Sequence, residues 1–196
     1  MISRKLTLVV LTITMMFSSL FSQVAISPTS AFLDNKQRFE TILIMNNSKD
    51  PQEVKLAFKF AYPKANKAGD IELIYDDAAE ENLHSATDWL RGFPKNFVLG
   101  PGERQIVRVT AKPPRGIEPG MYWSRLITTS SAVSPEVGAV NQTGISTQIT
   151  MQFNQITSIF YKYGELTSGV LPFKLRPVIE DQVANIFVDY TKSGNA

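Results

Sequence analysis

Polar and apolar residues alternate along residues 145–161, ISTQITMQFNQITSIFY. A repeat of two residues is typical of a β-strand that buries one face. Extended at about 3.3 Å per residue, the stretch would reach about 55 Å, roughly three times the usual strand length. The large apolar side chains in its first part are Ile145, Ile149, Met151 and Phe153. We therefore expect one strand that overruns its neighbours.

Shorter alternating runs lie earlier in the chain. In residues 53–60, EVKLAFKF, Val54, Leu56 and Phe58 share one face while charged residues share the other, as in a half-buried antiparallel strand. Clusters of Gly, Pro, Asn and Asp bound this run and the others. The other runs are residues 38–48, 70–75, 96–99, 104–111 and 121–130. About seven or eight strands at this spacing predict an all-β fold, an immunoglobulin-like β-sandwich.

Two local features interrupt the strands. Residues 76–85, DDAAEENLHS, are rich in Ala and Glu, which favours a short helix. The pair Pro101 and Gly102 separates two predicted strands. Proline fixes φ and glycine allows a positive φ, so we expect the chain to reverse there.

The pattern divides the chain into a main domain and a shorter C-terminal segment. We expect the sandwich over residues 23–163. Residues 164–196 contain a linker, an entry strand and one further strand. Two strands cannot close a sandwich, so this segment either starts a second β domain that is incomplete or forms a tail borrowed by the first. We favour the first interpretation.

The N-terminus has the features of an export signal. Arg4 and Lys5 precede an uncharged, apolar run, Leu6 to Phe17, which is too short to span a bilayer. Small residues follow, and cleavage near Ser22 is expected. Residues 1–22 are therefore predicted to be a signal peptide, and the protein to be exported across the inner membrane to the periplasm, with no membrane attachment after cleavage.

Charge and cysteine content narrow the choice of partners. The signal peptide contains two of the 20 basic residues and none of the 18 acidic ones, so the remaining chain is close to neutral. A neutral surface argues against a nucleic-acid partner and against electrostatic binding to lipid. The chain has no cysteine, so a packed apolar core has to stabilise the fold without disulfides.

Residues for catalysis are scarce. The chain has one histidine, His84, and no cysteine, so neither a nucleophilic triad nor a zinc site is expected. The acidic residues of DDAAEE could bind calcium, but a solvated helix N-terminus is the favoured interpretation. We expect no enzyme activity, no metal site and no cofactor.

Three stretches of the chain are distinctive: DWLRGFPKNFVLGPGERQIVRV at residues 88–109, PGMYWSRL at residues 119–126 and the final IFYKYG at residues 159–164. Together they resemble the PapD-like periplasmic chaperones of usher-type pilus assembly. The resemblance covers roughly residues 24–163. It implies an immunoglobulin-like N-terminal chaperone domain whose last strand complements a pilus subunit that lacks a strand.

The resemblance also implies which residues contact the subunit. The donor-strand positions fall on Ile149, Met151 and Phe153, preceded by Ile145. Implied partners are a protein subunit with an incomplete β-sandwich and an outer-membrane usher. If each apolar side chain is buried in the subunit, the gain is about 1.5–3 kcal/mol apiece before association costs.

One part of the family pattern is altered in this chain. The family holds the subunit's C-terminal carboxylate with an arginine in the first strand and a lysine in the last, and the matching positions here are Ser30 and Ser158. Serine cannot make the stronger charge-assisted contact. Lys162 keeps a basic residue at the domain junction. The loss of both charges favours an alternative function, a non-catalytic immunoglobulin-like module that binds polymers or proteins at the cell envelope.

Overall fold

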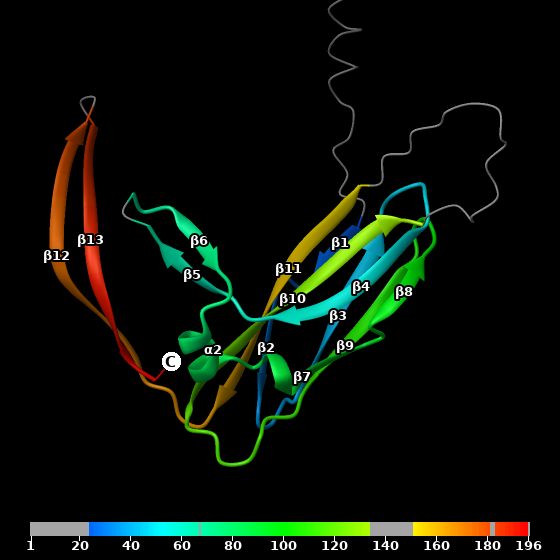
Figure 1. Ribbon diagram of the computed structural model, residues 1–196, viewed down its shortest axis with the longest axis horizontal. Helices are drawn as coiled ribbons and strands as arrows, with labels where there is room; N and C mark the ends of the chain where they lie inside the picture. Colours follow the sequence, from blue (N-terminus) through cyan, green and yellow to red (C-terminus); the bar gives the residue numbers. More distant parts are fainter. Residues whose placement is uncertain (1–23, 67, 134–150, 181–182, 196) are drawn as a thin grey trace, which may run out of the picture.

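The computed structural model describes residues 24–66, 68–133, 151–180 and 183–195 (Figure 1). The predicted signal peptide and two of the predicted donor-strand residues, Ile145 and Ile149, lie outside the described residues. No helix in the described ranges is long and apolar enough to cross a membrane.

Most of the described strands form two sheets that pack face to face (Figure 1). The four-stranded sheet has the order β1 (Val24–Ser27), β3 (Phe39–Asn46), β9 (Arg104–Ala111), β7 (Leu90–Phe93). The five-stranded sheet has the order β2 (Ser30–Asp34), β11 (Gln152–Tyr163), β10 (Gly120–Ala132), β4 (Gln52–Lys59), β8 (Asn96–Leu99). Neighbouring strands are antiparallel except for β2 and β11, which run parallel. The predicted β-sandwich is confirmed.

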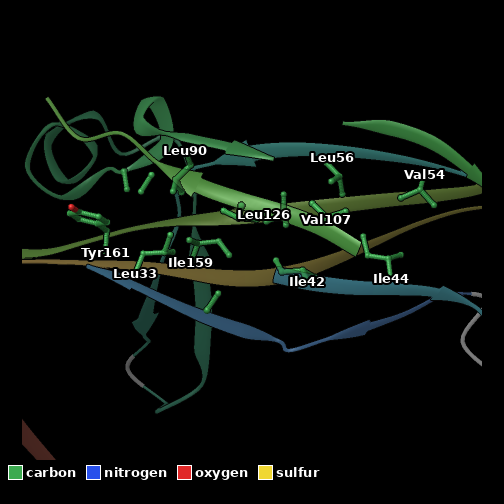
Figure 2. Packing of buried hydrophobic residues seen from close by; sticks show 14 of the residues in the cluster. Leu33, Ile42, Ile44, Val54, Leu56, Leu90, Val107, Leu126, Ile159 and Tyr161 are labelled. Atoms are coloured by element: carbon green, nitrogen blue, oxygen red, sulfur yellow. The ribbon is translucent and has the colours of Figure 1, made fainter. Parts of the chain in front are cut away.

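The core lies between the inner faces of the two sheets, as Figure 2 shows. Alternation along each strand supplies it, because every second side chain points inward. The fully buried apolar side chains include Ile42, Ile44, Val54, Val107, Val109, Leu126, Ile159 and Tyr161. Each such side chain contributes about 1.5–3 kcal/mol by leaving water, so a chain without cysteine can be held together by this core.

The predicted turn at Pro101 and Gly102 is present. Gly102 has a φ of 72°, and its N–H donates to the carbonyl of Asn46 at 2.9 Å. The buried Asn46 side chain in turn donates from Nδ2 to the carbonyls of Leu99 and Gly100, at 3.0 and 3.1 Å. One asparagine at the end of β3 therefore fixes the path of the turn between β8 and β9.

The predicted helix is also present, as α2 (Ala78–His84), and the short 3-10 turn η1 (Thr87–Trp89) follows it. Asp77 caps α2 by accepting from the N–H groups of Ala79 and Glu80, at 3.2 and 3.4 Å. Before the helix, β5 (Tyr62–Ala65) and β6 (Ile71–Ile74) form a small hairpin. This hairpin and α2 connect β4 to β7 across the ends of the two sheets (Figure 1).

The C-terminal segment forms a long antiparallel hairpin of β12 (Ser168–Glu180) and β13 (Val183–Gly194). Within the described ranges these two strands pair with each other and with no strand of the sandwich. One face of the hairpin is apolar and open to solvent: Leu175, Ile179, Ile186 and Val188 are between 47% and 78% exposed. The division into a sandwich at 23–163 and an incomplete second domain at 164–196 stays a prediction.

Candidate functional site

Strand β11 pairs with a neighbouring strand over a greater length on one side than on the other. It pairs with β10 along its whole length, from Gln152 to Tyr163. On the other side, its pairing with β2 covers only Ser158–Lys162. The N-terminal half of β11 therefore extends beyond β2, next to β10, which pairs in turn with β4. Figure 1 shows β10 and β11 side by side.

The two predicted donor residues within the described ranges, Met151 and Phe153, lie at the N-terminal end of β11. Thr157, Ile159 and Tyr161 are at most 1% exposed and share the inner face of β11. Because side chains two apart lie on one face, Phe153 continues the same row. It is nevertheless 42% exposed, and Met151, just before the strand, is 62% exposed. The inner row of β11 thus begins with Phe153, preceded by Met151, two apolar side chains that the sandwich covers only in part.

The two serines singled out from the sequence come together in the structure. Ser30 and Ser158 are direct partners in the parallel β2–β11 pair, and the Ser158 N–H donates to the Thr29 carbonyl at 3.0 Å. Paired residues lie on the same face of a sheet. Both serines therefore belong to the outer face of the five-stranded sheet, opposite to the face that carries Ile159.

A buried arginine stands beside these serines, and the sequence analysis missed it. Arg125 is the partner of Ser158 in the β10–β11 pair, and its Nη1 donates a hydrogen bond to Ser158 Oγ. Its Nε donates to the Ala61 carbonyl at 3.1 Å. Only 7% of Arg125 is exposed, and burial lowers the pKa of its guanidinium from the ordinary value. A basic residue inside the apolar-rich run MYWSRLITTS was the available signal.

Aromatic side chains surround this part of the outer face. Phe32 and Phe160 stack with ring centroids 5.1 Å apart, and Phe32 is 64% exposed. The Phe160 ring centroid lies 6.0 Å from Arg125 Cζ. Trp123 also stacks on His84 at 4.8 Å, so the single histidine of the chain packs against this face. The arrangement combines one buried cation with an exposed apolar rim.

Lys162, predicted at the domain junction, lies at the end of the β2–β11 pair opposite Asp34. The pKa of Asp34 lies below its ordinary value, mainly because the Asp34 carboxylate accepts from the N–H groups of Gln37 and Lys36, with smaller contributions from nearby positive charges. Lys162 lines a shallow hollow of about 290 Å³ together with Phe32 and Phe160. Lys162 therefore borders the same outer surface as Arg125.

The acidic residues near α2 interact with neighbouring side chains and with the helix N-terminus. Asp76 lies 3.2 Å from the Lys59 ammonium, and Asp77 accepts from the Tyr62 hydroxyl at 2.7 Å as well as capping the helix. In the part of the chain that the structure describes, no group of three or more histidine or acidic side chains is placed to hold a metal ion.

No protein family model and no curated protein sequence matches the chain. Among solved structures, the fold is similar to the YadV chaperone, with a TM-score of 0.51 and 8% identity over 88% of this chain and 84% of that one. It is similar to a chain of the Salmonella enterica SafA pilin in complex with the SafB chaperone, with a TM-score of 0.50 and 12% identity over 90% and 84%. The class 5 fimbriae chaperone CfaA gives a TM-score of 0.50 and 20% identity over 88% of this chain and 67% of that one.

At these identities the likeness shows the fold. The chain therefore has the PapD-like chaperone fold that the sequence motifs predicted. The positions of Met151, Phe153, the two serines and Arg125 follow from the geometry described above.

Proposed function

We propose that this protein is an exported, periplasmic chaperone for the assembly of pili, fimbriae or a related surface structure. It holds a subunit by donating residues 145–157 as a strand, without turnover or nucleotide. The observation that carries the proposal is the exposure of Met151 and Phe153 at one end of a row whose other end, Thr157 to Tyr161, is core. The signal-like residues 1–22 and the fold shared with fimbrial chaperones support it.

The physical basis is strand addition. An incompletely paired strand can hydrogen-bond to a second chain while alternate side chains enter pockets of that chain. Desolvating Met151 and Phe153 would contribute about 1.5–3 kcal/mol each, which has to exceed the cost of association. The proposed partner is a protein subunit whose β-sandwich lacks a strand, and an outer-membrane usher would receive the complex.

The test is co-expression of the chain with a strand-deficient subunit encoded beside its gene, followed by purification of the complex. Replacing both Met151 and Phe153 with glutamate should reduce recovery of the complex at least tenfold, because two charges would enter the apolar groove. Melting temperature and circular dichroism should stay near wild type, since both side chains are already exposed.

A matched control lies on the opposite sheet. Ile106 and Leu43 are direct partners in the β3–β9 pair, 61% and 37% exposed, so their double replacement by glutamate adds the same charges to an equally exposed site. This control should leave the complex intact. Equal recovery with both double variants would refute strand donation from residues 151–153.

The alternative is an immunoglobulin-like module that binds envelope polymers or proteins, which the absence of basic residues at Ser30 and Ser158 favours. Cell fractionation separates the two functions. A free periplasmic protein that purifies with a small β-rich subunit supports the chaperone, whereas firm retention in the wall fraction supports the module.

A further inference from the structure

A crevice opens at the seam between the two sheets, where β4 and β7 lie. Its volume is about 300 Å³, at the small end of the range for ligand pockets. β7 is the last strand of the four-stranded sheet, and β8 pairs with β4 only from Gln52 to Lys55. In the described ranges, the rest of β4 therefore has no strand beside it on this side, and the crevice lies between it and β7.

The walls of the crevice are mainly apolar. Leu56 and Leu90, from opposite sheets, are at most 3% exposed and belong to the core drawn in Figure 2. The half-buried Phe58 packs against that core and also lines the crevice. Thr87 contributes a hydroxyl, but this group already shares a hydrogen bond with Ser124 Oγ at 2.9 Å. An apolar chain is therefore the occupant that these walls fit.

Two positive charges line the solvent side of the crevice, because Arg91 and Lys95 belong to its lining and are both exposed. The ion pairs in the described ranges include neither side chain. The Arg91 guanidinium donates from Nη1 to neutral backbone carbonyls, those of Asp88 and Leu90, at 3.0 and 2.7 Å. Both charges therefore remain available to an anionic group at the entrance.

A peptide strand fits this edge poorly. β7 has only four residues, Leu90–Phe93, and Pro94 directly after it has no N–H to donate. Strand addition along β7 would therefore be limited to a few hydrogen bonds. A ligand without a peptide backbone can use the apolar walls and the two cations without pairing to that edge.

We propose that the crevice between β4 and β7 binds a small amphipathic anion, an unbranched acyl chain of medium length that ends in a carboxylate. The acyl chain lies among Leu56, Phe58 and Leu90. The carboxylate lies near Arg91 and Lys95. The site is separate from subunit capture, because none of these residues belongs to β2, β10 or β11.

The test is titration of the purified chain with octanoate, monitored by calorimetry and by the NMR signal of the Gly92 amide, since Gly92 lines the crevice. We expect saturable binding and a shift of this signal. Butanoate has four fewer CH₂ groups. Because each buried CH₂ is worth about fourfold in affinity, butanoate should bind on the order of a hundredfold more weakly. Octanamide has the same chain length without the charge and should bind at least threefold more weakly.

Gly92 allows the crevice to be filled by a substitution. A Cβ on Gly92 would lie 3.7 Å from the Phe58 ring and 3.8 Å from Leu56 Cδ1, which is ordinary van der Waals contact. Gly92→Val should therefore fold, occupy the crevice and weaken octanoate binding at least tenfold. Thr41→Val, at an exposed position of the same sheet outside the crevice, is the control and should bind octanoate within twofold of wild type.

Removal of both charges tests the contact with the carboxylate. Arg91→Met combined with Lys95→Met should weaken octanoate binding at least threefold and leave octanamide binding within twofold, because only the acid uses the charges. Arg104→Met combined with Lys112→Met removes two exposed cations outside the crevice. This matched control should leave both affinities within twofold of wild type.

A further compound tests a protein side chain as the occupant. N-acetylleucine amide should bind at least tenfold more weakly than octanoate, and binding as tight as that of octanoate would overturn the proposal. So would a lack of saturable octanoate binding, equal affinity for octanoate and octanamide, or unchanged octanoate affinity in Gly92→Val. None of these results depends on whether a subunit is captured.

Discussion

Arg125 and Ser158 face each other across the β10–β11 pair, with the guanidinium of one donating to the hydroxyl of the other. Replacing Ser158 with aspartate would place a carboxylate beside this buried cation. We expect the free energy of unfolding to rise by about 1 kcal/mol or more, because the added ion pair compensates a charge that is already buried. Chemical denaturation at neutral pH measures the change.

The carboxyl introduced by Ser158→Asp should make the stability of this variant depend on pH. The guanidinium should hold the pKa of the introduced carboxyl below its unfolded value of about 3.9. The gain in the free energy of unfolding is then complete at a pH above the unfolded pKa, and it is lost as the pH falls through the folded pKa. In a double-mutant cycle, the same substitution in an Arg125→Met background should give no gain. An equal gain in both backgrounds would show that Arg125 and position 158 are not coupled.

The inner face of β11 should divide sharply between core and exposed positions. Ile159 is fully buried, so Ile159→Ala should cost about 2–5 kcal/mol through lost burial and a cavity. Phe153 lies in the same row but is 42% exposed, so Phe153→Ala should cost much less than a buried phenylalanine would. Urea denaturation of the two variants provides the comparison, and similar losses would place Phe153 in the core.

Alternation and local signals were enough to predict most of the sandwich. The run 53–60 alternates as β4 does, and Ala-rich and Glu-rich residues form α2 after the Asp77 cap. These features depend on residues that are close in the sequence. The parallel pairing of β2 with β11 brings Ser30 opposite Ser158, and only the resemblance to a family linked those two positions in advance.

The burial of Arg125 could not be predicted from the sequence. On an alternating strand, a basic residue is expected on the solvent face, and Arg125 is indeed on the outer face. Its burial depends on neighbours from other strands, including Ser158 and the Ala61 carbonyl just beyond β4. Composition gives no information about such contacts. Only the register of β10 against β11 shows that the Arg125 guanidinium lies beside Ser158.

The buried Asn46 should contribute more to the free energy of unfolding than an exposed asparagine does. Its buried amide donates to two adjacent carbonyls where the turn leaves β8, those of Leu99 and Gly100. Asn46→Ala would leave these carbonyls without that donor, and we expect a loss of about 1–3 kcal/mol in the free energy of unfolding. The adjacent Asn47 is exposed, so Asn47→Ala should change stability by less than about 0.5 kcal/mol. Thermal and urea unfolding of both variants would test this, and equal effects would contradict a role for the buried amide.

The start of α2 should respond to acid through Asp77. Hydrogen bonds hold the pKa of Asp77 below its ordinary value, first from the Tyr62 hydroxyl and then from the N–H groups of Glu80 and Ala79. Stability from a depressed carboxyl pKa is present above the unfolded value and is lost as the pH falls through the folded pKa. Tyr62→Phe removes the largest contribution, so the pKa of Asp77 should rise.

NMR titration of the side-chain carboxyls measures the pKa of Asp77. Asp34 is the internal control, because its pKa is lowered by the N–H groups of Gln37 and Lys36 instead. An unchanged pKa of Asp77 in Tyr62→Phe would show that the hydroxyl does not stabilise the capping carboxylate.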